Sequence, residues 1–208
     1  MKVKLINSVF KFLQLASIDY VVLRNFTDIP NKITISNDLE LLICHKNIDY
    51  FHEKMISFGF EVFRDQGLYL YGARPHFHFV IKESDLHIDV VDGLFYRSLM
   101  NRKCYIKADD YLQKTIFARK ITLKSIWKYR PSHEDLLTHL CCHCIFDKNE
   151  VSDKYEAIIN EEYAKSDKEL LLKYFEKVFF KASALIMENI SSNNTRMIYG
   201  NYIKYNKY

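Results

Sequence analysis

The chain has 208 residues and a formal net charge of +4, from 30 Lys and Arg against 26 Asp and Glu. Hydrophobic residues make up 49% of it, and only 5 Gly and 3 Pro are present, which excludes a disordered chain and a many-stranded β-sandwich. The basic excess falls short of the basic stripe of a dedicated nucleic-acid binder, although it suits a substrate that carries phosphates.

The N-terminal segment carries apolar residues, but Lys11 interrupts them and no small-residue cleavage site follows. The longest apolar stretches are too short to cross a bilayer. We therefore expect a cytoplasmic protein without a membrane span. In that reducing compartment its five cysteines would stay thiols.

The N-terminal half is predicted to alternate helices and strands. Apolar spacing predicts a helix over residues 4–17, and the β-branched run at 18–23 predicts a buried strand. After a polar loop, a strand over 38–44 begins with alternating acidic and apolar residues, and a helix over 46–58 is closed by Gly59. Turn residues then separate four short predicted strands, over residues 60–64, 68–72, 76–81 and 86–91.

Beyond Gly93 the pattern turns helical. Ser132 is predicted to cap a helix that has Asp135 at its third position and runs to Phe146. Two more helices are predicted over residues 152–188, followed by a polar loop and a polar, aromatic tail. We therefore expect two domains, an α+β domain over residues 1–105 and a helical domain over 106–208.

Three acidic residues are the most informative feature. Asp38 and Glu40 occupy alternate positions of a predicted strand, so their carboxylates share one face. Asp89 lies in the strand of LHIDVVD, and it completes a three-carboxylate site if the two strands are neighbours. Adjacent carboxylates repel each other unless a cation intervenes, and Mg²⁺ is commonly held by carboxylates and substrate phosphates. The alternative is that one acid caps a turn while the other is solvated.

The segment YVVLRNFTDIPNKITISNDLELLI resembles the opening of nucleotidyltransferase domains encoded in bacterial surface-polysaccharide gene clusters, within the polymerase-β-like superfamily. HIDVVDGLFYR is similar to the segment that carries the superfamily's third carboxylate. HEDLLTHLCCHCIFDKNEVSDKY resembles the helical half of such proteins. The resemblance covers residues 18–155 and implies an α+β fold, a nucleotidyltransferase-like mixed β-sheet with flanking helices followed by a C-terminal helical bundle.

The resemblance also implies roles for particular residues. Asp38, Glu40 and Asp89 would be the catalytic acids and the ligands of Mg²⁺ or Mn²⁺, with an NTP as substrate. Arg24 and Asn25 occupy the place of the superfamily's Gly-Ser, which contacts nucleotide phosphates, so Arg24 would act there as a charged clamp. Two departures are a Glu at position 40 where Asp is usual and the absence of the small Gly-Ser turn.

Other signals remain open between a functional and a structural interpretation. Arg97 could contact phosphates, together with a basic set formed by Lys120, Lys124, Lys128 and Arg130, or the lysines could be a solvated helix face. HLCCHC, from His139 to Cys144, could hold zinc or bury its thiols as small hydrophobes. His76 and His78 share a strand face that lies near the acids or is exposed.

The sequence thus predicts a Mg²⁺-dependent nucleotidyltransferase that moves a nucleotidyl group from an NTP to a small hydroxyl or phosphate acceptor, in surface-polysaccharide synthesis. Its partners would be the nucleotide and the small-molecule acceptor, not nucleic acid. The alternative is a catalytically inactive nucleotidyltransferase-fold module that binds a partner or ligand, which the missing Gly-Ser favours. A zinc-stabilised interaction domain built on HLCCHC is a third hypothesis.

Overall fold

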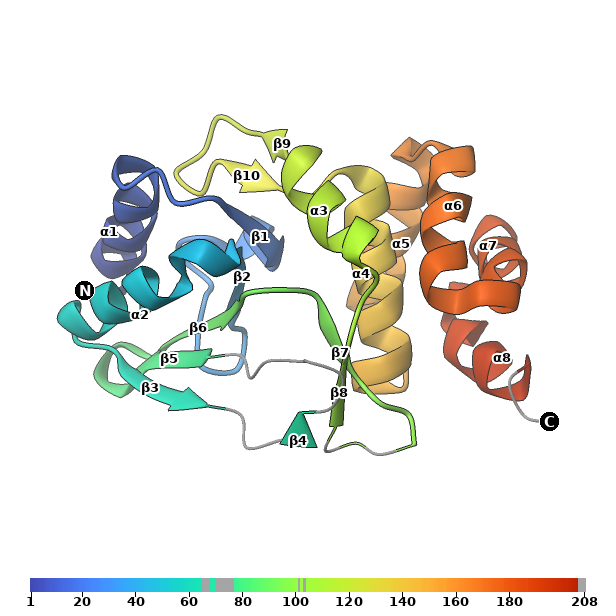
Figure 1. Ribbon diagram of the computed structural model, residues 1–208, viewed down its shortest axis with the longest axis horizontal. Coiled ribbons are helices and arrows are strands. Elements are labelled where there is room, and N and C mark those ends of the chain that lie inside the picture. Colours follow the sequence, from blue (N-terminus) through green and yellow to red (C-terminus); the bar gives the residue numbers. More distant parts are fainter. Residues whose placement is uncertain (65–67, 70–76, 101, 103, 206–208) are drawn as a thin grey trace.

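The computed structural model describes residues 1–64, 68–69, 77–100, 102 and 104–205 (Figure 1). His76 and most of the predicted strand over 68–72 lie outside the described residues. The part of that strand that is described is β4 (Leu68–Tyr69).

A mixed five-stranded sheet forms the centre of the N-terminal half, in the order β1-β2-β6-β5-β3. The strands are β1 (Tyr20–Arg24), β2 (Leu39–Ile43), β3 (Glu61–Arg64), β5 (Phe77–Ile81) and β6 (Leu86–Val91). Strands β2 and β6 pair in parallel, and the other neighbours pair antiparallel. The predicted mixed sheet is confirmed.

Helices α1 (Lys2–Leu15) and α2 (Ile48–Ser57) cover one face of this sheet (Figure 1). They arise because apolar side chains recur at helical spacing, and these side chains pack on the strand residues that point to the same face. After α2, Gly59 adopts a positive φ of 88°, a conformation that glycine accepts without strain. Both predicted N-terminal helices are confirmed.

The segment after Gly93 differs from the expected helix. It contains β7 (Phe95–Arg97) and β8 (Cys104–Lys107), which join β4 in a small sheet before α3 (Asp110–Ala118) begins. Strand β8 pairs parallel with β4, about 35 residues earlier in the chain, and such long-range pairing overrides local helix propensity. Strands β9 (Ile121–Thr122) and β10 (Tyr129–Arg130) then form a short hairpin.

The C-terminal part is helical, as predicted. Its elements are α4 (His133–Cys142), the π-helix η4 (His143–Lys148), α5 (Asp153–Lys165), α6 (Lys168–Phe179), α7 (Ser183–Ser191) and α8 (Ile198–Tyr205). The Ser132 cap is confirmed, since its side chain accepts a hydrogen bond from the Asp135 amide. The two helices expected over 152–188 are three, because Asp167 caps a new helix start and Phe180, with a positive φ of 51°, ends that helix before α7.

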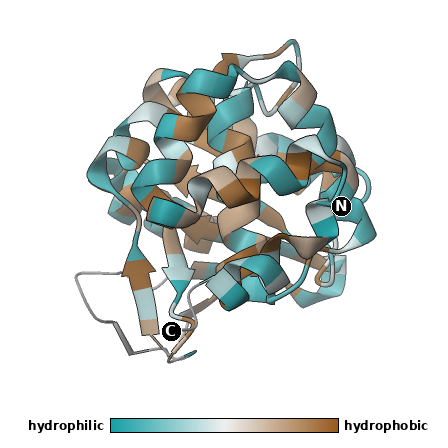
Figure 2. Ribbon diagram, turned by 90° about the vertical axis from the view of Figure 1, so that its right-hand side faces the viewer, coloured by the Kyte–Doolittle hydropathy of each residue, from teal (hydrophilic) through white to brown (hydrophobic). Residues whose placement is uncertain are grey.

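The expected polar loop and tail are also largely helical. Helix α7 continues to Ser191 because Ile186 and Ile190 are buried on its inner side, and α8 runs through Tyr205. Hydrophobic and hydrophilic residues alternate along these helices (Figure 2), as the burial of one side of each requires. None of the helices in the described ranges is both long and apolar enough to span a bilayer.

Two hydrophobic clusters form the core. The first lies between the sheet and helices α1 and α2. The second joins the C-terminal helices to the other sheet face, through Val21, Leu23 and Leu42. The C-terminal helices therefore cover the second face of the sheet at β1 and β2. The division of the chain at residue 105 stays a prediction.

Candidate functional site

The alternation of strand β6 places Asp89 on the second sheet face. Leu86, Ile88 and Val90 are buried in the first core, whereas His87 and Asp89 are only partly buried and point the other way. Strand register then sets the neighbours of Asp89, because Glu40 of β2 lies beside it on one side and His78 of β5 on the other.

Asp38 immediately precedes β2, and its carboxylate lies within hydrogen-bonding range of Asp89. Burial and the negative charge of Asp89 raise the pKa of Asp38 above its usual range. The two carboxylates therefore repel each other when both are ionised, and a cation between them relieves that repulsion. The sequence hypothesis brought Asp38, Glu40 and Asp89 together. In the structure Asp38 lies close to Asp89, and Glu40 is the register neighbour of Asp89.

Glu40 forms an ion pair with Arg24, in which Arg24 Nε donates a hydrogen bond to Glu40 Oε2. A bulge between Val22 and Arg24 turns both Leu23 and Arg24 toward the C-terminal helices, where regular alternation would have turned only one of them. Burial opposes the ionisation of Glu40, but the Arg24 guanidinium outweighs it and lowers the pKa of Glu40. Coordination of a metal by Glu40 would require this ion pair to open.

Arg24 makes further contacts with the C-terminal helices. Its Nη1 lies 3.1 Å from His143 Nε2 and 2.7 Å from the Tyr155 hydroxyl, and its Nη2 lies 3.6 Å from Asp38 Oδ2. Only 11% of the side chain is exposed. The role of Arg24 as a phosphate clamp stays a prediction. In the structure its guanidinium contacts both the sheet and the C-terminal helices, and the residue lines both cavities described below.

The π-helix η4 supplies His143, Asp147 and Lys148 to this region. Asp147 Oδ2 lies 3.1 Å from His143 Nδ1, and its Oδ1 accepts a hydrogen bond from the Arg97 amide at 2.9 Å. The π-helix is rare and often occurs at functional sites, because its wider turn re-aims the side chains that follow. The sequence pattern predicts a regular α-helix here, and the structure differs.

Asn25 follows Arg24 at the end of β1, where its φ of 59° is left-handed. Asn tolerates this conformation better than most side chains, so it fits a turn where glycine would otherwise be favoured. Its Nδ2 donates to the backbone carbonyl of Asp38 at 2.6 Å, and its Oδ1 accepts from Lys154. Asn25 thus fixes the backbone that carries Asp38.

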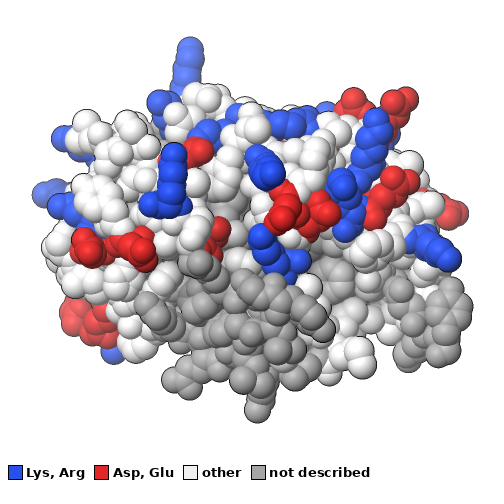
Figure 3. Space-filling model, in the orientation of Figure 1, with Lys and Arg blue, Asp and Glu red and all other residues white. Residues whose placement is uncertain are grey.

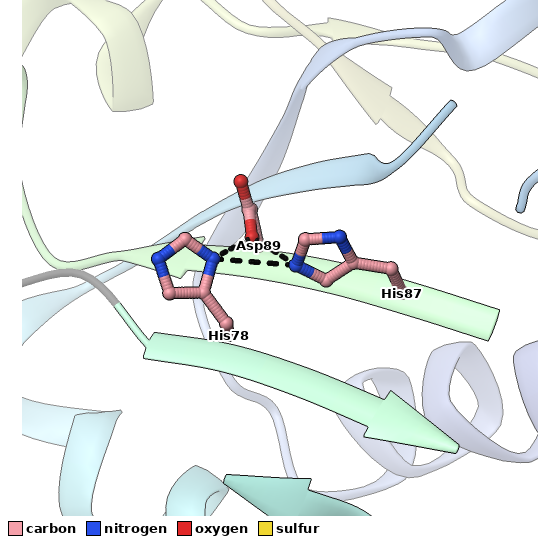
Figure 4. Close-up of side chains that lie close together, drawn as sticks. All are labelled: His78, His87 and Asp89. Atoms are coloured by element: carbon pink, nitrogen blue, oxygen red, sulfur yellow. Dashed lines mark hydrogen bonds and ion pairs between the residues drawn. The ribbon is translucent and has the colours of Figure 1, made fainter. Parts of the chain in front are cut away.

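Two histidines contact Asp89 (Figure 4). His78 Nδ1 and His87 Nε2 each lie 2.6 Å from Asp89 Oδ1, and the two ring nitrogens are 3.3 Å apart. Burial alone would raise the pKa of Asp89, but the interactions with His78 and His87 outweigh it and lower this pKa far below its usual range. Hydrogen bonding to Asp89 also raises the pKa of His87, despite its partial burial.

Two cavities flank the acid pair. One of about 400 Å³ is lined by Asp89, His78 and Glu40, and its basic lining residues are Arg24, Arg97, Arg102 and Lys148. The other, of about 330 Å³, is lined by Asp38, Asn25 and Lys154, and it shares Arg24 and Lys148 with the first. The first volume falls in the range of small-molecule sites.

The predicted basic set lies elsewhere. Lys120 pairs with Asp19, and Arg130 Nη2 lies 2.5 Å from Glu162 Oε2. None of the four residues of that set lines either cavity. Over the face seen in Figure 1, basic and acidic side chains are interspersed (Figure 3).

The HLCCHC cluster is part of the helical core. Cys141, Cys142 and Cys144 are free, buried thiols, and burial raises the pKa of each, that of Cys144 to about 12. Zinc binds thiolates, which this environment disfavours. Within the described ranges, the residues grouped closely enough to ligate a metal are instead His78, His87 and Asp89.

Acid sensitivity is expected from His139, which is buried near Tyr96, Glu40 and His143. Burial lowers the pKa of His139 to about 4, against about 6.5 in an unfolded chain. The unfolded chain therefore binds a proton between these pH values that the folded chain does not. Stability falls as the pH drops through this window, by about 2 kcal/mol at pH 5.

Urea unfolding at pH 7 and pH 5 measures this loss, with His139→Gln as the comparison because Gln cannot be protonated. The variant is expected to lose less stability on acidification than the parent chain. The raised pKa of His87 acts in the opposite direction, but it is present in both proteins and cancels. Equal losses in the two proteins would refute the role of His139.

No protein-family model matches the chain, and no curated protein matches its sequence significantly. Among solved structures, the chain is similar to the solution structure of the antibiotic-resistance factor ANT(2'')-Ia. The match covers 99% of this chain and 96% of that one, with 12% sequence identity and a TM-score of 0.45. The likeness is distant in both measures.

Proposed function

We propose that the protein is a divalent-cation-dependent nucleotidyltransferase that moves a nucleotidyl group from an NTP to a hydroxyl or phosphate of a small acceptor. The observation that carries this proposal is the convergence of Asp38 and Asp89, whose carboxylates meet although their positions are 51 residues apart. These donors fit a hard divalent cation, since each oxygen is a ligand that Mg²⁺ accepts and their mutual repulsion needs a positive charge.

In this proposal Asp38 and Asp89 would hold the cation, which would supply positive charge for the reacting phosphates. The proton of the attacking hydroxyl would pass to a carboxylate of this pair, and Asp38 is the stronger base because its pKa is raised whereas that of Asp89 is lowered. Arg97, Arg102 and Lys148 line the larger cavity and bind the triphosphate. Among the described residues Lys148 has no ion-pair partner, so its ammonium group is available to bind an anion.

Arg24 and Glu40 act together in this proposal, in place of the separate roles that the sequence suggests. Glu40 neutralises Arg24, and Arg24 also contacts Asp38. The two cavities on either side of the acid pair support two substrates, one in each. A role in surface-polysaccharide synthesis, with a sugar or sugar phosphate as acceptor, rests on the sequence resemblance alone.

The inactive binding module remains a second candidate, because the Arg24–Glu40 pair removes one of the three expected ligands. Thermal unfolding with each NTP, with and without Mg²⁺ or Mn²⁺, separates the two functions. A nucleotidyltransferase is expected to gain several degrees in Tm only when nucleotide and cation are both present, since ligand binding to the folded state stabilises it. No shift with any NTP, alone or with either cation, would contradict the proposal and favour the binding module.

A further inference from the structure

In its neutral form His87 has one N–H donor, and the contacts of its ring leave a nitrogen lone pair facing a carboxylate oxygen of Asp89. His87 Nδ1 lies 3.4 Å from the Ile35 carbonyl oxygen, which can only accept, so Nδ1 carries the proton of the neutral ring. Nε2 then presents a lone pair, yet it lies 2.6 Å from the Asp89 carboxylate oxygen. Two lone pairs at this separation need a positive charge, which is either a second proton on the ring or a metal ion.

The spacing of the donor atoms suits a metal ion. Nitrogen ligands at about 2.0–2.1 Å from a tetrahedral ion lie about 3.3–3.4 Å apart, and His78 Nδ1 and His87 Nε2 are 3.3 Å apart. The Asp89 oxygen, at 2.6 Å from both nitrogens, would move outward by about 0.7 Å to reach the same spacing. The bond from His87 to Ile35 is the outer contact that typically orients a ligating imidazole.

The three donor side chains are also held by regular strand pairing and are accessible to solvent. All three residues sit on adjacent central strands, and β-pairing holds His78 directly opposite Asp89. Their side chains are 16–27% exposed, so an ion can enter. Asp38 lies close to Asp89 but is not one of the three grouped donors.

We propose that His78, His87 and Asp89 bind a divalent transition-metal ion such as Zn²⁺, Co²⁺ or Mn²⁺. Two imidazoles favour such ions, whereas Mg²⁺ prefers oxygen ligands and keeps its waters. The proposal deepens the proposed function by naming the class of cation, and it rests on that function only for the catalytic consequence. Binding of the ion requires neither nucleotide nor turnover.

Calorimetric titration of the untagged, chelator-treated protein with Co²⁺, Zn²⁺ and Mg²⁺ tests the site. We expect one Co²⁺ or Zn²⁺ per chain, bound at least about tenfold more tightly than Mg²⁺. His78→Gln and His87→Gln should each weaken binding by about tenfold or more. His45→Gln is the matched control, because His45 Nδ1 also lies 2.7 Å from an aspartate, Asp92, and it should bind as the parent chain does.

The side-chain nitrogen NMR signals of the parent protein give a second readout that needs no variant. Zn²⁺ should shift the ring nitrogens of His78 and His87 and leave those of His45 in place. Unshifted rings, or Co²⁺ bound no better than Mg²⁺, would overturn the site. Mg²⁺-dependent transfer without Co²⁺ binding would overturn this inference alone. Co²⁺ binding at the histidines without transfer under any metal would instead overturn the proposed function.

Discussion

Asp38→Asn is expected to lower NTP-dependent pyrophosphate release by about a thousandfold while leaving the metal-free protein as stable as before or more so. The loss follows from removing a cation ligand, since the electrostatic contribution of a bound metal is several kcal/mol and each 1.36 kcal/mol is a tenfold change in rate. The gain in stability follows from burial and from the repulsion by Asp89, which make the ionised Asp38 unfavourable in the folded chain.

The measurement combines turnover, over a panel of sugars and sugar phosphates, with urea unfolding in chelator. Asp110→Asn is the control, because Asp110 is an exposed acid of α3 that lines neither acid-flanking cavity. It should leave the rate unchanged. Turnover that persists in Asp38→Asn would exclude Asp38 from the chemistry. Strong destabilisation would instead indicate that Asp38 has a structural role.

Arg24→Met is expected to destabilise the fold by about 3–5 kcal/mol, because it leaves the Glu40 carboxylate buried without its partner. The contacts of Arg24 with His143 and Tyr155 are lost as well. Adding Glu40→Gln should recover most of this loss, since the uncompensated charge is then gone. The single variant Arg24→Met is therefore expected to lose more free energy of unfolding than the double variant with Glu40→Gln.

Urea unfolding of the two single variants and the double variant forms the required cycle. Lys165→Met is the matched control, since Lys165 pairs with Glu161 on the exposed side of α5 and should contribute little. A double variant no more stable than Arg24→Met would show that Glu40 is not the group that Arg24 compensates. A loss as small as that of the control would show that Arg24 does not join the sheet to the helices.

Much of the sheet could be predicted from the sequence because its residues alternate. The DLELLI segment places Leu39 and Leu41 on one face and Glu40 on the other, and LHIDVV does the same for Ile88 and Asp89. The capping of α4 by Ser132 was equally local and was predicted correctly. Features that depend only on residues close in sequence can therefore be predicted without knowledge of the fold.

The sequence predicts the three acids as one site, but it does not predict which group each acid contacts, because those contacts depend on strand register. Asp38 meets Asp89, and Glu40 meets Arg24, only because β2 lies between β1 and β6 and a bulge turns Arg24 around. His87 could have been found, since it stands two residues before Asp89 on a strand and therefore shares its face. His143 and Asp147 lie at the site because residues 143–148 form a π-helix, and the hydrophobic periodicity of the sequence does not predict a π-helix there.

Diffraction from crystals soaked with Mn²⁺ and a non-hydrolysable NTP tests the shared cation most directly. The account predicts one anomalous peak within about 2.0–2.2 Å of an oxygen of Asp38 and an oxygen of Asp89, with the triphosphate beside Arg97 and Lys148. A peak bound elsewhere, or a nucleotide seated away from these two aspartates, would contradict it.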